Sequence, residues 1–351
     1  ALLLDFDDDG DRDLVTSTAG RLLLLANDGD GRFWLQGALA APEASSLAAA
    51  DIDLDGDLDL FTCGGASPYD HGPLPLPYQA ARDGTPDRMF ENHGEWLFVE
   101  AGAEFGLEPD PAGYGSAACF EDIDLDGDPD LYVARDFGHG SLYRNDGGTF
   151  RRVGAASGVD GTSSALGASF GDADGDGLFD LCLSNRSSPA GRRIVPQPAF
   201  QPAAAAELRE AYARLARGDL LYRNQGDGTF RAQGAPDAGR RALGALFCDL
   251  DGDGWQDLLC PGGLLSGARG PDLDGFHWRE VAARSPAEGE ADDAYAGAWS
   301  VFGRLLRSGY ACAGGERDAA FLNLGGQGFA EVSSMVGFDL AGDARATALC
   351  D

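Results

Sequence analysis

The sequence contains no lysine, and basic residues are few. All 26 basic residues are arginines, against 58 Asp and Glu, so the formal net charge is -32. A surface this acidic repels phosphate groups, which argues against a nucleic-acid partner. The missing lysine, together with abundant Ala, Gly and Asp, indicates a high-GC genome such as that of a bacterium.

Long hydrophobic runs are also missing. No stretch approaches the ~18–20 consecutive apolar residues that a membrane-crossing helix needs, so we predict no transmembrane segment in this chain. Histidine is scarce, and no motif joins the four copies at His71, His93, His139 and His277. Without a lysine or a grouped histidine to act as a base, the sequence gives little support to an enzyme.

Cysteine is scattered. The seven cysteines show no zinc-ligand spacing, which makes a zinc site improbable. We expect buried free thiols, with Cys119, Cys248 and Cys350 on strands that lead into acidic loops and Cys63, Cys182 and Cys260 on strands that leave them. A disulfide between Cys260 and Cys312 is the alternative.

The sequence is rich in aspartate, arranged in a repeated nine-residue pattern. In the copy from Asp51 to Asp59, acidic residues stand at positions 1, 3, 5 and 9, and Gly56 at position 6 permits a sharp turn. Calcium takes six to eight oxygen ligands at about 2.3–2.6 Å, and alternate residues of a tight loop can all point toward one ion. We call each such loop a cradle and predict that it binds Ca²⁺.

Five cradles share this register, which predicts about five calcium ions. In each, we expect carboxylates from positions 1, 3, 5 and 9 and the backbone carbonyl of position 7 as ligands. The alternative is five solvated acidic turns without an ion, but crowded carboxylates repel one another unless a cation neutralises them. The candidate ligands are Asp5, Asp7, Asp9, Asp11 and Asp13; Asp51, Asp53, Asp55, Asp57 and Asp59; Asp122, Asp124, Asp126, Asp128 and Asp130; Asp172, Asp174, Asp176, Leu178 and Asp180; and Asp249, Asp251, Asp253, Trp255 and Asp257.

The EF-hand is the competing interpretation, because it also begins with acidic residues at 1, 3 and 5 and Gly at 6. It requires a Glu at position 12 and a helix on each side. Position 12 of the five cradles is never Glu, and the flanks are short apolar runs of strand length. The cradles are therefore predicted to join two strands.

A second repeated element, Asn-x-Gly between aromatic or apolar runs, follows each cradle. It begins at Asn27, Asn92, Asn145, Asn224 and Asn323 and predicts a tight β-hairpin. Each unit then has four strands, and such units stack on one another as the blades of a β-propeller. We predict one all-β domain over residues 1–351, with five complete blades, a sixth entry strand at Ala344–Cys350, and six to eight blades in the intact ring.

Three inserts interrupt the blades, at residues 66–86, 187–218 and 264–318. The first is rich in Pro and Gly and predicts an irregular loop. The second and third predict helices over Ala203–Arg217 and Asp292–Ser308. The second helix carries an apolar stripe that includes Trp299, which either packs on the propeller rim or docks another protein.

The stretch from Asp130 to Phe150 resembles the strand-to-hairpin signature of the FG-GAP or VCBS repeats found in integrin-like propellers, and so does Leu166–Asp172. Within these repeats the chain is most similar to bacterial propellers of the ASPIC/UnbV and cartilage-acidic-protein type. The resemblance implies calcium-bound blades, an extracytoplasmic location (periplasmic, cell-surface or secreted) and a role in adhesion or assembly. The resemblance does not extend to that family's carboxyl-terminal module.

The function expected first is therefore a non-enzymatic, calcium-binding scaffold. Its partner would be another extracytoplasmic or membrane-associated protein, within a larger complex. A carbohydrate-binding propeller is the alternative, with Trp34, Trp96 and Trp278 as residues that could stack on sugar rings. A sugar lyase or dehydratase comes third.

Overall fold

The computed structural model describes residues 1–18, 20–65, 67–69, 72–107, 113–234, 236, 242–269, 271–312, 314–344 and 347. Five four-stranded antiparallel sheets dominate it, and each holds one cradle between its first two strands and one Asn-x-Gly hairpin between its last two. The predicted four-stranded β units are therefore confirmed.

The first sheet contains β1 (Leu2–Leu4), β2 (Asp13–Thr18), β3 (Arg21–Asn27) and β4 (Phe33–Ala40), and the second β5 (Ala44–Ala50), β6 (Asp59–Gly64), β7 (Arg88–Asn92) and β8 (Phe98–Glu100). The third contains β9 (Tyr114–Glu121), β10 (Asp130–Asp136), β12 (Ser141–Asn145) and β13 (Phe150–Arg152). The fourth contains β15 (Ala165–Gly171), β16 (Asp180–Asn185), β17 (Leu220–Asn224) and β18 (Phe230–Gly234). The fifth contains β19 (Leu246–Cys248), β20 (Asp257–Cys260), β22 (Ala319–Asn323) and β23 (Phe329–Glu331).

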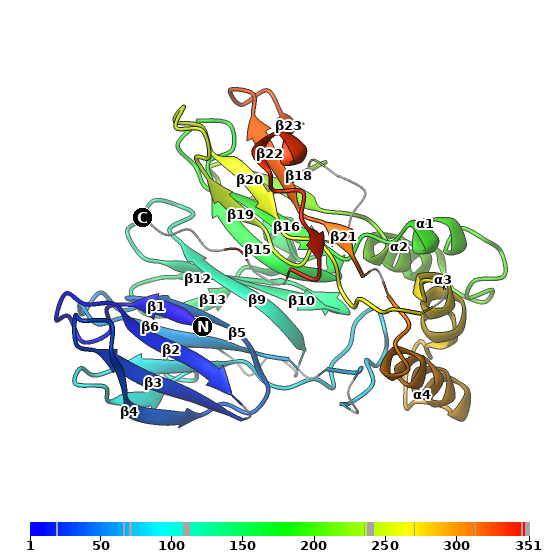
Figure 1. The fold of residues 1–351 in the computed structure, drawn as a ribbon, viewed down its shortest axis with the longest axis horizontal. Coiled ribbons are helices and arrows are strands. Elements are labelled where there is room, and N and C mark those ends of the chain that lie inside the picture. Colours follow the sequence, from blue (N-terminus) through cyan, green and yellow to red (C-terminus); the bar gives the residue numbers. More distant parts are fainter. Residues whose placement is uncertain are drawn as a thin grey trace.

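The five sheets follow one another in chain order. The first strands of neighbouring sheets lie side by side, β1 by β5, β5 by β9, β9 by β15 and β15 by β19. Figure 1 shows the sheets fanned out in this order, with the first at the lower left and the fifth at the top. This stacking buries the apolar faces that a single sheet would leave in water.

The apolar core lies between sheets. In the second to fifth sheets, the leucine that follows the last cradle residue is at most 1% exposed, because the preceding sheet covers it. These leucines are Leu60, Leu131, Leu181 and Leu258. Their counterpart in the first sheet, Leu14, is only half-buried. Leu14 also lies in register with leucines on the three other strands of that sheet, Leu3, Leu25 and Leu35. The outward face of the first sheet is thus an apolar surface of the kind that the other sheets bury.

Hairpin asparagines connect the sheets. The amide of Asn145 donates to the carbonyl of Ile52 in the second cradle at 2.9 Å and to that of Pro129 in its own cradle at 3.3 Å. The same two bonds recur from Asn92 to Phe6 and Leu58, from Asn224 to Ile123 and Phe179, and from Asn323 to Ala173 and Gln256. Each asparagine therefore ties its own cradle to the cradle before it.

The three inserts pack together into one helical module beside the sheets (Figure 1). Tyr78 of the first insert stacks on Tyr212 of the second, and its hydroxyl lies 2.7 Å from Nε2 of His277 in the third. The elements of the second and third inserts are α1 (Pro189–Ile194), α2 (Ala206–Leu215), α3 (Asp274–Phe276), a π-helix (His277–Val281), a 3₁₀ turn (Ala282–Arg284) and α4 (Asp293–Arg307).

The predicted helices exist with slightly shorter bounds. Helix α4 begins after Asp292, whose carboxylate accepts from the backbone N–H of Tyr295 at 2.8 Å. Trp299 is 3% exposed, so its stripe packs inside the helical module and is not a docking surface. The described part of the first insert has no helix or strand, as predicted. No helix in the described part of the chain has the length and apolar character of a membrane span.

The remaining elements are short. A 3₁₀ turn (Gly154–Ser157) and α5 (Ser333–Val336) follow the third and fifth sheets. Two further pairs of strands join β11 (Gly138–His139) to β14 (Thr162–Ser163) and β21 (Glu316–Arg317) to β24 (Ala341–Gly342). Most of the predicted sixth entry strand, Ala344–Cys350, lies outside the described residues.

The alternative of a disulfide between Cys260 and Cys312 is wrong. Both cysteines are buried but they are not joined to each other, because Cys260 packs between the fourth and fifth sheets whereas Cys312 packs in the helical module. The four other described cysteines are free thiols, on the strands predicted for them, and Cys350 lies outside the described residues.

We predict that Asn145→Ala lowers the free energy of unfolding by about 2–3 kcal/mol, because the carbonyls of Ile52 and Pro129 lose their donor in a buried setting. The matched control is Asn27→Ala. Asn27 has no described sheet before it, and its amide donates to the Arg12 carbonyl alone. Asn27→Ala should therefore lower the free energy of unfolding by about 1 kcal/mol or less. Urea unfolding of both variants measures the difference, and equal losses would contradict the linking role.

Candidate metal centre

The five cradles lie between strands, as predicted, and not between helices. Each joins the first strand of its sheet to the second, and the glycine at position 6 has a positive φ, +103° at Gly56. Residues with a Cβ rarely adopt that conformation, so glycine is what allows the loop to turn back on itself. The EF-hand alternative is thereby excluded for the described loops.

Carboxylates from each cradle meet at one point. In the first, third, fourth and fifth cradles, ligand atoms from positions 1, 3 and 9 lie within 4.8 Å of one another, and in the second those from positions 1, 3 and 5 do so. Three of the four expected carboxylate positions therefore converge in every cradle. Carboxylate oxygens are the donors that a hard cation such as Ca²⁺ prefers.

Backbone N–H groups fix the carboxylates in place. In the third cradle, Asp122 accepts from Gly127 at 2.9 Å, and Asp126 accepts from the N–H of Asp128 at 3.1 Å. The same two bonds recur in the other four cradles. The position 1 and position 5 side chains are thus set by the loop itself.

The aspartate at position 9 joins the cradle to the hairpin. In Asp59, one oxygen accepts from the N–H of Ile52 at 3.1 Å and the other from that of Asn92 at 2.8 Å. Asp13, Asp130, Asp180 and Asp257 make the same pair of bonds and are equally buried. Burial raises the pKa of Asp59 and of Asp130 to about 7, and nearby cradle carboxylates add to the rise. Asp59 and Asp130 therefore lack a compensating positive charge that a cation would supply.

Unsatisfied carboxylate oxygens are a second reason why the donor set fits a calcium ion. Buried carboxylate oxygens inside four cradles accept no hydrogen bond, at Asp7, Asp124 and Asp174 in position 3 and at Asp51 in position 1. A buried acceptor without a donor is costly, and a bound cation would satisfy it. These residues would hold the ion when it is present.

The side chain at position 7 turns away from the cradle toward its own hairpin. The carboxylate of Asp128 accepts from the N–H of Gly147 at 2.8 Å, and Leu178 and Trp255 lie against hairpin glycines. At Gly29 an added Cβ would lie 2.6 Å from the Asp11 carboxylate, so the hairpin needs glycine here. The position 7 side chains are therefore used by the hairpins, and the position 7 carbonyl stays a predicted ligand.

Sequence reasoning missed three side chains that reach into cradles. The indole of Trp96 donates to Asp7 at 2.9 Å, from the hairpin of the second sheet into the first cradle. Arg144 and Arg223, each just before a hairpin asparagine, pair with carboxylates of the third and fourth cradles. The Tyr-Arg-Asn triplet at both places is the signal that could have found the arginines.

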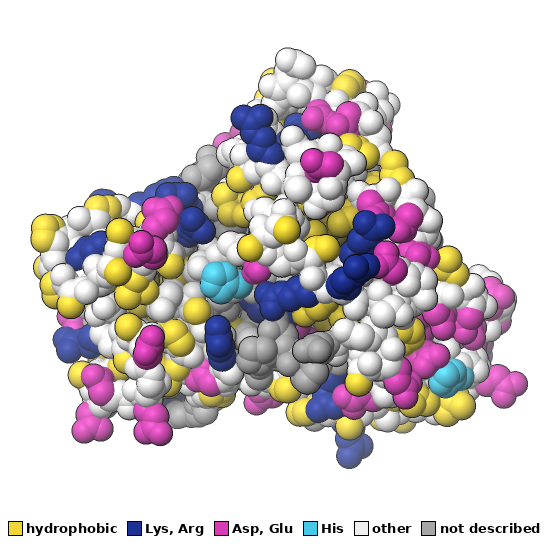
Figure 2. Space-filling view, turned by 180° about the vertical axis from the view of Figure 1, so that it is seen from behind, with side chains coloured by type: hydrophobic (Ala, Val, Ile, Leu, Met, Phe, Trp, Pro, Cys, Tyr) yellow, Lys and Arg dark blue, Asp and Glu magenta, His cyan; other side chains and the backbone are white. Residues whose placement is uncertain are grey.

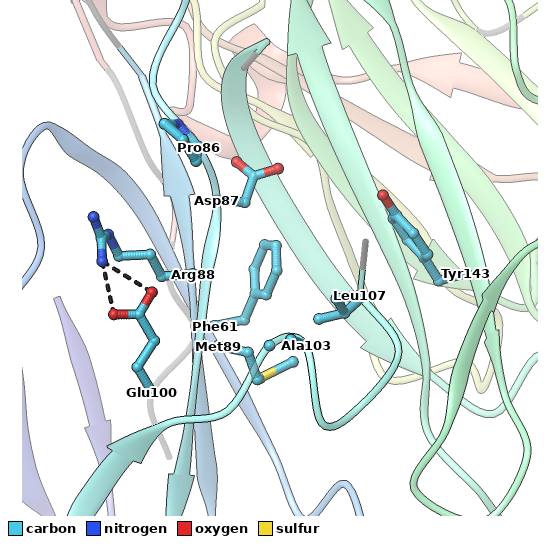
Figure 3. A pocket seen from close by; sticks show the side chains of 10 residues that line it. Phe61, Pro86, Asp87, Arg88, Met89, Glu100, Ala103, Leu107 and Tyr143 are labelled. Carbon is cyan, nitrogen blue, oxygen red and sulfur yellow. Dashed lines mark hydrogen bonds and ion pairs between the residues drawn. The ribbon is translucent and has the colours of Figure 1, made fainter. Parts of the chain in front are cut away.

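A separate cavity of about 510 Å³ lies between the second and third sheets. Figure 3 shows Phe61, Met89 and Leu107 forming its apolar part and an Arg88–Glu100 ion pair of 2.7 Å at one side. Asp87, also in its lining, accepts from Gly64 at 2.9 Å and pairs with Arg135 at 2.8 Å. An apolar floor with a few polar groups is typical of a small-molecule site.

The tryptophans proposed for sugar stacking are placed differently from one another. Trp34 is 47% exposed, whereas Trp278 is 3% exposed inside the helical module, so Trp278 was a wrong candidate. Trp96 is half-buried over the first cradle. The described histidines, His93, His139 and His277, lie in different parts of the structure, and His71 is outside the described residues.

We predict that Asp130→Asn destabilises the protein by about 2–3 kcal/mol even in chelator, because an amide cannot accept both backbone N–H groups. Asp126→Asn is the matched control. Its side chain is exposed and an amide oxygen can still accept from Asp128, so its effect in chelator should stay within about 0.5 kcal/mol. Equal effects in urea unfolding would contradict the structural role of position 9.

Comparison with solved structures finds several proteins at low similarity. An Agrocybe aegerita lectin, described as specific for non-reducing terminal N-acetylglucosamine, shares 15% identity over 93% of this chain and 63% of its own, with a TM-score of 0.44. The V. cholerae biofilm matrix protein Bap1 shares 15% over 64% of this chain and 26% of its own, with a TM-score of 0.33. A Bacillus licheniformis rhamnogalacturonan lyase shares 16% identity over 74% of this chain and 54% of its own, with a TM-score of 0.33. The chain spans less than two thirds of each of these proteins.

No curated protein matches the chain. Three stretches, residues 5–62, 122–183 and 211–260, match the family model of the FG-GAP-like repeat. The matched stretches contain the first to fifth cradles, which the structure places at equivalent points of five four-stranded sheets. These three stretches are therefore similar to FG-GAP-like repeats.

Proposed function

We propose that this chain is the calcium-stabilised propeller of a non-enzymatic binding scaffold that works outside the cytoplasm. The observation that carries the proposal is the convergence of three carboxylates at each of five equivalent points, with a buried oxygen left without a hydrogen bond in four of them. Asp at positions 1, 3, 5 and 9 and the carbonyl at position 7 would hold each ion. Extracytoplasmic calcium is plentiful enough to fill modest sites, and filling them stabilises the folded state.

Calcium would act here as a structural element. It would join positions 1, 3 and 9 of a loop whose ninth residue is already bonded to the hairpin of the same sheet. The loop, the hairpin and, through the asparagine amide, the preceding loop would then move as one body. A scaffold needs this rigidity, because a preorganised surface loses less entropy on binding.

The proposal includes a ring of six to eight blades and membership of the ASPIC/UnbV-like group. The first-sheet leucines support further blades, since their counterparts in the other sheets are covered by a preceding sheet. The partner we propose is another extracytoplasmic or membrane-associated protein. The face shown in Figure 2 carries many acidic side chains with arginines among them, which favours a polar partner surface.

Removal of calcium tests the proposal directly. We expect about five ions per chain by elemental analysis after dialysis against calcium. Excess chelator should lower the melting temperature by on the order of 10 °C, since each filled site adds stability by mass action. An unchanged melt, with no calcium retained, would rule out the calcium role.

The alternative function is carbohydrate binding, and the cavity between the second and third sheets is the observation that favours it. Its lining combines apolar surface with the Arg88–Glu100 pair, and this combination suits a sugar ring and its hydroxyl groups (Figure 3).

If the cavity holds a sugar, the chain should give signals on a glycan array that Arg88→Ala abolishes. Arg21→Ala changes an exposed arginine on β3, far from the lining, and should leave those signals intact. A silent array would leave the scaffold as the better proposal. A sugar lyase or dehydratase remains the third candidate.

A further inference from the structure

The third and fourth cradles differ from the other three because an arginine enters each of them. Arg144 stands just before the hairpin Asn145, and its Nη2 atom lies 2.8 Å from Asp124 and 3.3 Å from Asp126. Those two carboxylates occupy positions 3 and 5 of the third cradle. The guanidinium therefore touches the side chains that we assign to calcium.

Arg223 occupies the equivalent place before Asn224 and enters the fourth cradle more deeply. Its side chain is 11% exposed, and its Nη1 atom lies 3.4 Å from Asp174 and pairs with the buried Asp180. Its Nη2 atom lies 3.4 Å from the Ala173 carbonyl, and Nε donates to Gln233 at 2.9 Å. Contacts on four sides hold the guanidinium at positions 3 and 9 of the cradle.

Among the described residues, the other three cradles have no such cation. The residue before the hairpin asparagine is Ala26, Glu91 or Leu322. Within the described residues, no arginine forms an ion pair with the carboxylates of these three cradles. In the first cradle, the neutral indole of Trp96 donates to Asp7 instead.

A guanidinium and a calcium ion compete for the same oxygens. Asp124 and Asp174 stand at position 3, and Asp180 stands at position 9. The number of uncompensated ligand charges is one of the two properties that set calcium affinity in acidic loops. Both the second and the fourth cradle offer four ligand carboxylates, but in the fourth an arginine pairs with two of them, Asp174 and Asp180.

We propose that Arg144 and Arg223 are internal counter-ions that divide the five cradles into two classes. The third and fourth cradles bind calcium more weakly, and the arginines keep these two loops ordered when calcium is scarce. The first, second and fifth cradles bind calcium more tightly and lose order without it. This inference rests on the proposed calcium function and adds an affinity-determining residue to two of its sites.

The test is hydrogen–deuterium exchange of the whole chain across a calcium titration, because it reports each loop separately. In the wild-type protein, peptides covering 5–13, 51–59 and 249–257 should become protected at lower calcium than those covering 122–130 and 172–180. In chelator the order should reverse, with 172–180 the most protected of the five.

Variants make the test specific. Arg223→Gln should lower the calcium midpoint of 172–180 by about tenfold or more, speed its exchange in chelator, and leave 51–59 unchanged. Arg223→Lys keeps the charge and should stay close to wild type. Leu322→Arg should raise the calcium midpoint of 249–257 alone. This variant keeps the inference testable if the Arg223→Gln protein does not fold.

The outcomes separate this inference from the one on which it rests. If calcium protects all five loops at one concentration and Arg223→Gln and Leu322→Arg change no midpoint, the counter-ion role is wrong and calcium binding stands. If calcium protects no loop, both proposals fail together. Shifts confined to the altered cradle support the counter-ion role.

Discussion

The structure depends on a buried carboxylate that accepts two backbone N–H groups, once in every sheet. The ninth cradle residue, Asp59 in the second sheet, receives one N–H from the start of its loop and one from the hairpin asparagine. Hydrogen bonds to an ionised group are roughly twice as strong as neutral ones. This residue is therefore a charge-assisted link between the loop and the hairpin of its sheet, beside the weaker bond from the asparagine amide to the same loop.

The cost of this arrangement is a concentration of negative charge. Burial raises the pKa of the ninth residue, while carboxylates at positions 1 and 3 lie within 4.8 Å of it in four cradles. Such a group is stable only if positive charge comes close. The chain offers two sources, a divalent ion from outside and, in two sheets, a guanidinium from its own hairpin.

The sequence predicted the repeated parts of this protein well and the connections between them poorly. The Asp and Asn-x-Gly spacing located all five cradles and hairpins, because each depends on residues close together in the chain. The same locality explains why the helix after Asp292 was found. Contacts across long separations gave no such signal, and the packing of Tyr78 against His277, 199 residues apart, was not foreseen.

Individual residue roles were harder to predict than elements. The Tyr-Arg-Asn triplet marks the place of Arg223 in the sequence, but its contacts with the cradle come from side-chain packing, and Arg231 on the neighbouring strand is exposed. Likewise, Trp278 and Trp34 both occur in loop- or hairpin-like sequence, but the helical module buries the first. Composition reports which side chains are present and says little about which ones water can reach.

The hairpin asparagines give the molecule a direction. Each one reaches toward the sheet made earlier in the chain and never toward the one made later, from Asn92 through to Asn323. A ribosome releases the amino-terminal sheet first, so every newly emerging sheet finds its acceptor carbonyl already in place. Assembly can therefore proceed in the order of synthesis, with each finished sheet serving as the template on which its successor is seated.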